Sequence, residues 1–264
     1  MDTNSKAEDI ARHPRPGVAN WWAAEATIAS YNHVYQVAYR TKYREHGPIG
    51  ISIYEDAPIA PFQYEFLALS ENAHEVMDAV LSYPIPGDKL YVINVFHPQP
   101  SSATLKIQYS RYGHEFVRTG PILGLELSGK GRDVPANIQK AQTLQQAETA
   151  NHFLAREGER IHAETLRDEH ILSFYASVDG EAAGWLQLVT VYPQVAYINQ
   201  LYILKPYRQR RLGTALVQRA HLEAYELGLK RMILIPSEMG MPLYRRLGYR
   251  PLLYFSVFRP ERDE

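Results

Sequence analysis

The 264-residue chain contains no cysteine, which excludes disulfide bonds, thiolate metal ligands and a cysteine nucleophile. It also lacks a large charge of either sign. The formal net charge is -1, so no overall field attracts nucleic acid or an anionic membrane. No apolar run approaches the length of a membrane span, and the polar N-terminal segment is unlike a signal peptide. We therefore expect a cytoplasmic protein that binds neither membranes nor nucleic acids.

The composition is otherwise that of a soluble globular protein, with 45% hydrophobic and 22% charged residues. The length suffices for one large domain or two small ones. Residues 1–17 are polar and contain two of the prolines, so we predict a flexible arm. Residues 128–135 are rich in Gly, Lys and Asp and form the best candidate linker. The predicted division is therefore an arm, an N-terminal domain over 18–128 and a C-terminal domain over 136–264.

Hydrophobic periodicity in the first half predicts alternating helices and strands. Gly47-Pro48 ends the first helix, and Ser70 is the expected cap of the second. Trp21 and Trp22 are interpreted as core or interface residues rather than as a ligand-stacking pair. The predicted helices cover 18–44, 70–80 and 104–111, and the predicted strands cover 49–54, 62–69, 90–96 and 122–127.

The second half has the order helix, three strands, helix, strand, helix, strand. The helices are predicted over 138–157, 214–227 and 242–247, and the strands over 171–178, 183–191, 195–204, 231–235 and 252–258. This order predicts an α/β sheet whose central crossover begins after the strand 195–204.

A basic loop separates that strand from the next helix. It contains four cations, Lys205, Arg208, Arg210 and Arg211. The first turn of a helix leaves backbone N–H groups unpaired and carries a partial positive charge. Arginines beside such a turn favour a phosphate-bearing ligand. Arginine-rich loops before helices are also common as solvent-exposed connections without a ligand. The loop alone therefore does not distinguish a phosphate-binding site from an ordinary surface loop.

Three motifs in order resemble the GNAT superfamily of N-acetyltransferases over residues 138–259. The family's pyrophosphate motif is Arg or Gln, two residues, Gly, one residue, then Gly or Ala, and residues 208–213 read Arg-Gln-Arg-Arg-Leu-Gly. A Ser-headed segment leading to a tyrosine follows the later strand, here Ser237 to Tyr244. The Leu-Gly-aromatic step is present at 247–249. One residue departs from the pattern, because Arg211 replaces the first motif glycine.

The resemblance implies a mixed central sheet flanked by helices and acetyl-CoA as co-substrate, with no metal. It implies that backbone groups at 201–203 pair with the pantetheine arm and that the basic loop holds the pyrophosphate. The residues expected to contact the coenzyme are Leu201, Tyr202, Ile203, Arg208, Arg210, Arg211, Leu212, Gly213, Thr214 and Ser237. Tyr244 is expected to protonate the departing CoA thiolate as a general acid, the alternative being a core tyrosine.

The general base is not assigned by the resemblance. Four side chains near the expected cleft are candidates by sequence order: Glu164, Asp168, His170 and Glu238. Glu238 directly follows the strand that flanks the cleft and is the first choice among them. A chain of water molecules is an alternative to all four.

The first half shows a weaker internal match to the second. Residues 109–113 lie 135 positions before residues 244–248, and both segments carry Tyr, Arg and Gly at the same places. At this offset the loop equivalent to the basic loop falls on 70–78, which is acidic and has neither Arg nor Gly. We predict two tandem GNAT-like domains, the first degenerate and without a coenzyme site, with chance similarity as the alternative.

The function expected from the resemblance is an acetyl-CoA-dependent N-acetyltransferase acting on a primary amine of a small molecule or peptide. The alternative is a non-catalytic GNAT-fold module that senses acetyl-CoA or an amino-acid-like ligand. Nucleic-acid binding through 205–211 is disfavoured because the basic run is short. Edge-strand pairing through 49–69 predicts a homodimer.

Overall fold

The computed structural model describes residues 20–54, 61–87, 89–128 and 137–261. The predicted arm over 1–17 and nearly all of the linker over 128–135 lie outside the described residues. Within the described residues, every helix is too short or too polar to cross a membrane.

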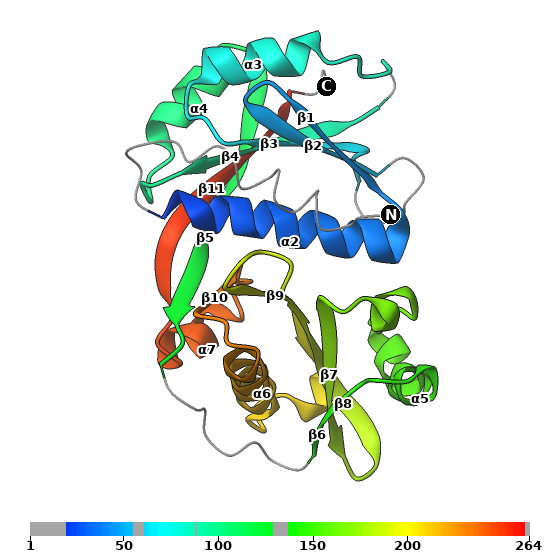
Figure 1. Ribbon diagram of the computed structural model, residues 1–264. Helices are drawn as coiled ribbons and strands as arrows, with labels where there is room; N and C mark the ends of the chain where they lie inside the picture. The colour runs from blue at the N-terminus through cyan, green and yellow to red at the C-terminus, as the bar shows by residue number, and fades with distance from the viewer. Residues whose placement is uncertain (1–19, 55–60, 88, 129–136, 262–264) are drawn as a thin grey trace.

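A single mixed sheet of eleven strands runs through the described molecule in the order β1-β2-β3-β4-β11-β5-β10-β9-β8-β7-β6 (Figure 1). The strands are β1 Lys42–His46, β2 Ile49–Ile53, β3 Tyr64–Ala68, β4 Tyr91–His97, β5 His114–Glu126, β6 Ile138–Lys140, β7 Ile171–Val178, β8 Glu181–Val189, β9 Val195–Ile203, β10 Arg231–Leu234 and β11 Arg250–Pro260. The helices are α2 Trp21–Tyr39, α3 Ala73–Ser82, α4 Ala103–Ser110, α5 Leu144–Leu154, α6 Leu212–Glu226 and α7 Met241–Arg246, with the 3-10 turns η1 Ala155–Glu157, η2 Glu164–Arg167 and η3 Lys205–Tyr207.

The two halves repeat one succession of elements. The order β2-β3-α3-β4-α4-β5 in the first half corresponds to β8-β9-α6-β10-α7-β11 in the second. In each half, one parallel pair carries the crossover helix, β3 with β4 and β9 with β10. The predicted fold class, a mixed sheet flanked by helices in two tandem copies, agrees with this arrangement.

The last strands of the two halves are exchanged. β11 lies between β4 and β5, and β5 lies between β11 and β10. The strand that ends the second half therefore pairs with the first half, while β5 pairs with β10 at Glu126–Leu123. Figure 1 shows these two long strands running from one half to the other. The predicted boundary between an N-terminal domain over 18–128 and a C-terminal domain over 136–264 remains a prediction.

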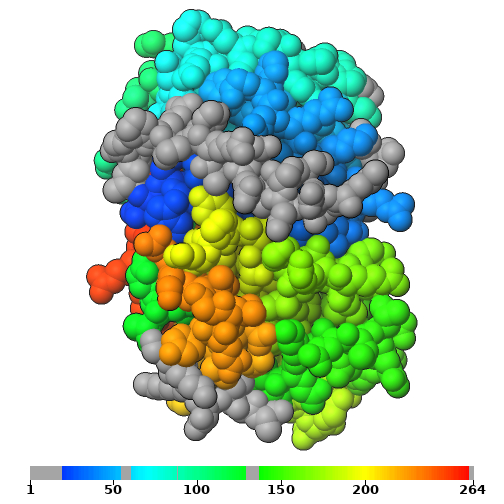
Figure 2. Space-filling view, in the orientation of Figure 1, coloured from blue at the N-terminus to red at the C-terminus, as the bar shows by residue number. Residues whose placement is uncertain are grey.

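Helix α2 lies across the junction of the halves (Figure 1). Its buried face includes Ala23, Ala24 and Ala26, whose small side chains let the helix approach the sheet closely. The apolar cluster beneath it contains residues of both halves, such as Leu67 of β3 and Tyr197 of β9. In space-filling view the N-terminal half occupies one end of the molecule and the C-terminal half the other (Figure 2).

Three local predictions were wrong. Lys42–His46 forms β1 instead of continuing the first helix, and Ile138–Lys140 forms β6 instead of opening a long helix. The cap of α3 is Asn72 and not Ser70, because the Asn72 side chain accepts hydrogen bonds from two backbone N–H groups of the first turn. β2 and β3 are paired on both sides, so the region 49–69 is not a sheet edge. The homodimer itself remains a prediction.

Candidate functional site

The parallel strands β9 and β10 diverge from one another in the C-terminal half. They are paired from Val195↔Arg231 to Ile198↔Leu234, and β9 then continues to Ile203 while β10 ends at Leu234. On the other side, β9 remains paired with β8 as far as Ile203. Within the described residues, the last five residues of β9 therefore have a ladder partner on one side only.

A β-bulge marks the point of divergence. Leu188 pairs with Ile198 and Gln187 pairs with Gln200, so Asn199 is the additional residue. The Asn199 side-chain amide donates to Gln187 Oε1 at 2.9 Å, which fixes the bulge. A bulge increases the local twist and re-aims the strand. The bulge coincides with the position at which the pairing of β9 with β10 ends.

The basic loop and the start of α6 lie beside the end of β9. A Cβ added to Gly213 would lie 3.8 Å from Ile203 Cγ1 and 3.9 Å from Leu201 Cδ2. The nearest atom would be Leu243 Cδ2 of α7, at 3.4 Å. The structure thus brings the predicted strand and loop residues together, with α7 next to them.

The first turn of α6 offers backbone donors. The first helical hydrogen bond runs from Ala215 N to Arg211 O, so the N–H groups of Leu212, Gly213 and Thr214 have no acceptor within the helix. Arg210 and Arg211 are exposed next to this turn. Free N–H groups and exposed guanidinium groups are the donors that phosphate oxygens require. The residues present fit a pyrophosphate.

Arg208 is less free than its neighbours. Its Nε donates to the carbonyl oxygen of Ile203 at 3.0 Å, and its guanidinium carbon lies 5.6 Å from the centroid of the Tyr202 ring. Ile203 is one of the residues expected to pair with a pantetheine arm, and its carbonyl already has a donor here. An incoming ligand must therefore displace this contact or use other groups of β9.

Arg211 adopts the conformation that the missing motif glycine would supply. Its backbone has φ 61° and ψ 9°, in the left-handed region, at the N-cap of α6. A non-glycine residue is strained there. The replacement is therefore compatible with the turn, at a cost in backbone energy, and it places a cation beside the unpaired N–H groups.

Tyr244 lies on α7 in the apolar cluster that also contains Ile198 and Leu234, the last pair before the strands separate. Its side chain is 5% exposed, and burial raises the pKa of its phenol. The ring meets Tyr249 edge-on, with centroids 5.5 Å apart. Within the described residues its hydroxyl has no hydrogen-bond partner, so it remains available to a ligand.

Ser237 and Glu238 lie in the turn before α7. Ser237 Oγ accepts from Gly240 N at 3.1 Å, and Ser237 O accepts from the N–H of Met241, so this serine organises the start of α7. Both Ser237 and Glu238 are exposed.

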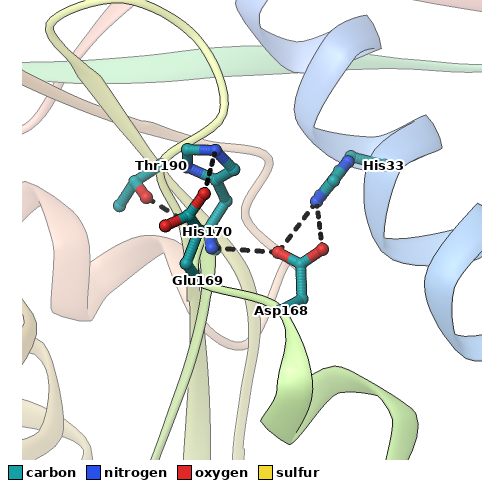
Figure 3. Close-up of polar contacts among 5 residues, drawn as sticks. All are labelled: His33, Asp168, Glu169, His170 and Thr190. Carbon is teal, nitrogen blue, oxygen red and sulfur yellow. Dashed lines mark hydrogen bonds and ion pairs between the residues drawn. The ribbon is translucent and has the colours of Figure 1, made fainter. Parts of the chain in front are cut away.

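Two other candidate bases, Asp168 and His170, lie at the start of β7 and contact α2 (Figure 3). Both carboxylate oxygens of Asp168 are 3.0 Å from His33 Nε2, and Asp168 Oδ1 accepts from His170 N at 2.9 Å. Burial alone would raise the pKa of Asp168, but the His33 contact and the His170 N–H outweigh it and lower the pKa. The cluster joins α2 to the second half. Glu164 is exposed on η2.

Sequence reasoning missed two residues close to the bulge. Tyr197 is 3% exposed and directly precedes Ile198. Glu159 Oε2 accepts from Trp185 Nε1 at 2.9 Å and from Gln200 Nε2 at 3.0 Å. Tyr197 alternates like any core residue and carries no distinguishing signal. The polar pair 199–200 inside an apolar strand is the signal that could have indicated the bulge.

Glu157 ties the end of β9 to the end of α5. It accepts from the Tyr202 hydroxyl at 2.7 Å and from Lys205 N at 2.9 Å. The Tyr202 hydrogen bond is the main cause of the lowered pKa of Glu157. The Tyr202 side chain therefore has a structural role. Its backbone is paired with Trp185 of β8, and the described part of the chain provides no ladder partner on its other side.

Comparison with known proteins places this architecture in one class. Residues 138–249 match the model of the acetyltransferase (GNAT) family. The chain therefore carries a GNAT acetyltransferase domain in its second half. No curated protein matches the chain.

Solved structures share the fold across both halves. A GCN5-related N-acetyltransferase from Kribbella flavida is 17% identical, with a TM-score of 0.66 over 94% of this chain and 97% of that one. A tandem GNAT protein from the clavulanic acid biosynthesis pathway is 13% identical, with a TM-score of 0.55 over 100% and 98% of the two chains. A putative GNAT acetyltransferase from Novosphingobium aromaticivorans is 16% identical, with a TM-score of 0.53 over 91% and 96%. These likenesses establish the fold.

Proposed function

We propose that the protein is an acetyl-CoA-dependent N-acetyltransferase acting on a primary amine of a small molecule or peptide. The observation that supports this most is the divergence of β9 from β10 beside the unpaired N–H groups of α6. The diverging backbone offers hydrogen bonds to an extended chain, and the helix start offers them to phosphates. Acetyl-CoA contains both parts and supplies the acetyl group.

Within this proposal, Leu201, Tyr202 and Ile203 orient the extended arm through their backbone groups. Arg210, Arg211 and the N–H groups of Leu212, Gly213 and Thr214 bind the pyrophosphate. Arg208 is available to it once its hydrogen bond to Ile203 is released. Ser237 supports the site indirectly, by capping the turn before α7.

Tyr244 is the proposed general acid. Its raised pKa keeps the phenol protonated at neutral pH, the state in which it donates a hydrogen bond. The hydroxyl is free for a sulfur atom that develops negative charge as the acetyl group leaves. The acceptor amine must lose a proton before it attacks, and the residue that takes this proton is not part of the proposal.

The coenzyme half of the proposal is tested by calorimetric titration with acetyl-CoA. Arg210→Gln should weaken binding by about tenfold or more, because a hydrogen bond between charged groups is lost. Arg245→Gln, which alters an exposed arginine on α7, is the matched control and should bind as the wild type does. Equal affinity in all three proteins, or no binding to the wild type, would contradict the proposed site.

The catalytic half is tested by CoA-thiol release with a panel of primary amines and peptides. Tyr244→Phe should reduce turnover by about 10²-fold or more and leave acetyl-CoA affinity nearly unchanged. A wild-type protein that binds acetyl-CoA but releases no thiol with any amine would favour the non-catalytic binding module. Unchanged turnover in the variant would remove Tyr244 from the mechanism.

A further inference from the structure

A cavity of about 530 Å³ lies where β11 joins the strands of the first half. It is lined by residues of β3, β4, β5 and β11 and of the adjoining loops, and its described lining includes nothing from β9, β10, α6 or α7. Its volume is in the range of sites for small molecules. The cavity is therefore a candidate site that the proposed acetyl transfer does not use.

The carboxylate of Glu65 lines this cavity. Its Oε2 accepts a hydrogen bond from the Tyr54 hydroxyl, and its Oε1 accepts one from Asn94 Nδ2 at 2.6 Å. Burial raises the pKa of Glu65, while these neutral donors oppose the rise. The charge of Arg118 also acts to lower this pKa, but the described residues place no cation within ion-pair distance of the carboxylate. A carboxylate has lone pairs for more than two donors, so an ammonium group would supply a closer charge and further donors.

Arg118 also lines the cavity, and its charge acts on the Glu65 carboxylate. Arg118 is exposed, and its guanidinium carbon lies 4.9 Å from the centroid of the Phe255 ring. The described part of the chain gives it no ion pair. Guanidinium groups bind carboxylates with two parallel hydrogen bonds. Arg118 is therefore suited to an anionic group on the same ligand.

Apolar side chains form most of the remaining lining. They include Phe62, Leu90, Val92, Val117 and Val257, and the lining also contains the charged residues Lys89, Arg259 and Glu261. A ligand held by its charged ends must therefore present an apolar body to these walls, since buried polar groups without partners are costly.

We propose that this cavity binds a small zwitterion with an apolar body, such as an apolar amino acid, with its ammonium group at Glu65 and its carboxylate at Arg118. The inference is independent of the acetyl-transfer proposal, because the two sites share no residue.

Three probes of one shape separate the two charges. L-leucine has both, 3-methylbutylamine has the ammonium group alone, and 4-methylpentanoate has the carboxylate alone. Each is titrated into the full chain without acetyl-CoA, with binding followed by ligand-observed NMR up to about 10 mM. Leucine should bind more tightly than either partial analogue.

Substitutions assign the contacts. Glu65→Gln retains the size of the side chain and should weaken leucine and 3-methylbutylamine by about tenfold. Arg118→Gln, at an exposed position, should weaken leucine binding and leave 3-methylbutylamine binding unchanged. Glu148→Gln and Arg167→Gln, at exposed positions on α5 and η2, are the controls.

Absence of binding by all three probes would overturn the proposal. Binding that is equal in the wild type and in Arg118→Gln would also overturn it, even if Glu65→Gln fails to fold.

Discussion

At the scale of single residues, Arg211 shows how one side chain affects both backbone energy and chemistry. Its left-handed backbone favours glycine, which occurs at this place in the family motif. Arg211 lies next to the unpaired N–H groups of Leu212, Gly213 and Thr214, where its charge can contribute to phosphate binding. Substitution of Arg211 and of its neighbour Arg210 separates the effect of the backbone strain from that of the side-chain charge.

Arg211→Gly should raise the free energy of unfolding by up to about 1 kcal/mol, because the relief of strain exceeds the added entropy of the unfolded chain. Arg210→Gly is the matched control. Arg210 does not have a positive φ, so its replacement should lower stability by about 0.5–1 kcal/mol. Urea unfolding of both variants measures the difference. A loss of stability in Arg211→Gly would show that its side-chain contacts outweigh the strain.

At the scale of elements, α6 is held on the sheet by apolar residues at helical spacing and by one polar contact. Leu212, Leu216 and Ala220 are buried along one face. On another face His221 Nε2 is 2.8 Å from the Tyr249 hydroxyl at the start of β11. Burial lowers the pKa of His221 to about 4. This histidine therefore makes the packing of α6 on the sheet sensitive to pH.

Replacement of His221 should flatten the pH dependence of stability. Below pH of about 6.5 the unfolded chain takes up a proton at this histidine, while the folded chain does not until about pH 4. The folded state thus loses up to about 3 kcal/mol as pH falls through this window. His221→Gln removes that loss. Urea unfolding between pH 7 and pH 4 measures it, and exposed His152→Gln serves as the control. Parallel curves for wild type and His221→Gln would contradict the assignment.

The elements with strong patterns were predictable from sequence, and the exceptions have physical reasons. The predicted segments for β7, β9, α6 and β10 agree with the structure within two residues because their apolar periodicity is clear. β1 was missed because three of its five residues, Lys42, Arg44 and Glu45, are charged and exposed, so the strand has no apolar periodicity. Charged residues of this kind are expected on an edge strand. The roles of the predicted coenzyme residues remain predictions, although the structure brings most of them to one place. The contact between Arg208 and Ile203 was not predictable, since it depends on side-chain geometry.

At the scale of the whole molecule, the exchange of β5 and β11 makes each half depend on the other. No local pattern specifies which strand will lie beside β10, so strands over 122–127 and 252–258 were predicted but not their partners. Among the described strands β11 pairs with β4 and β5 alone, and both belong to residues before the predicted linker. The sheet that supports β9 and β10 therefore includes β5 of the first half, which pairs with β10. The second half does not supply this neighbour itself, because its own last strand, β11, pairs with β4 and β5.

The exchange predicts that the second half will not fold stably alone. A fragment of residues 137–264 leaves β11 without either neighbour and exposes the edge of β10 that β5 now covers. It should be insoluble or unfold without a cooperative transition, while coexpression with residues 1–128 should give a soluble one-to-one complex. Size-exclusion chromatography, circular dichroism and acetyl-CoA titration provide the readouts. The competing arrangement has β11 moving next to β10 in place of β5, which would yield a folded, coenzyme-binding monomer. That result would show that the exchange is a consequence of covalent linkage and not a requirement of the fold.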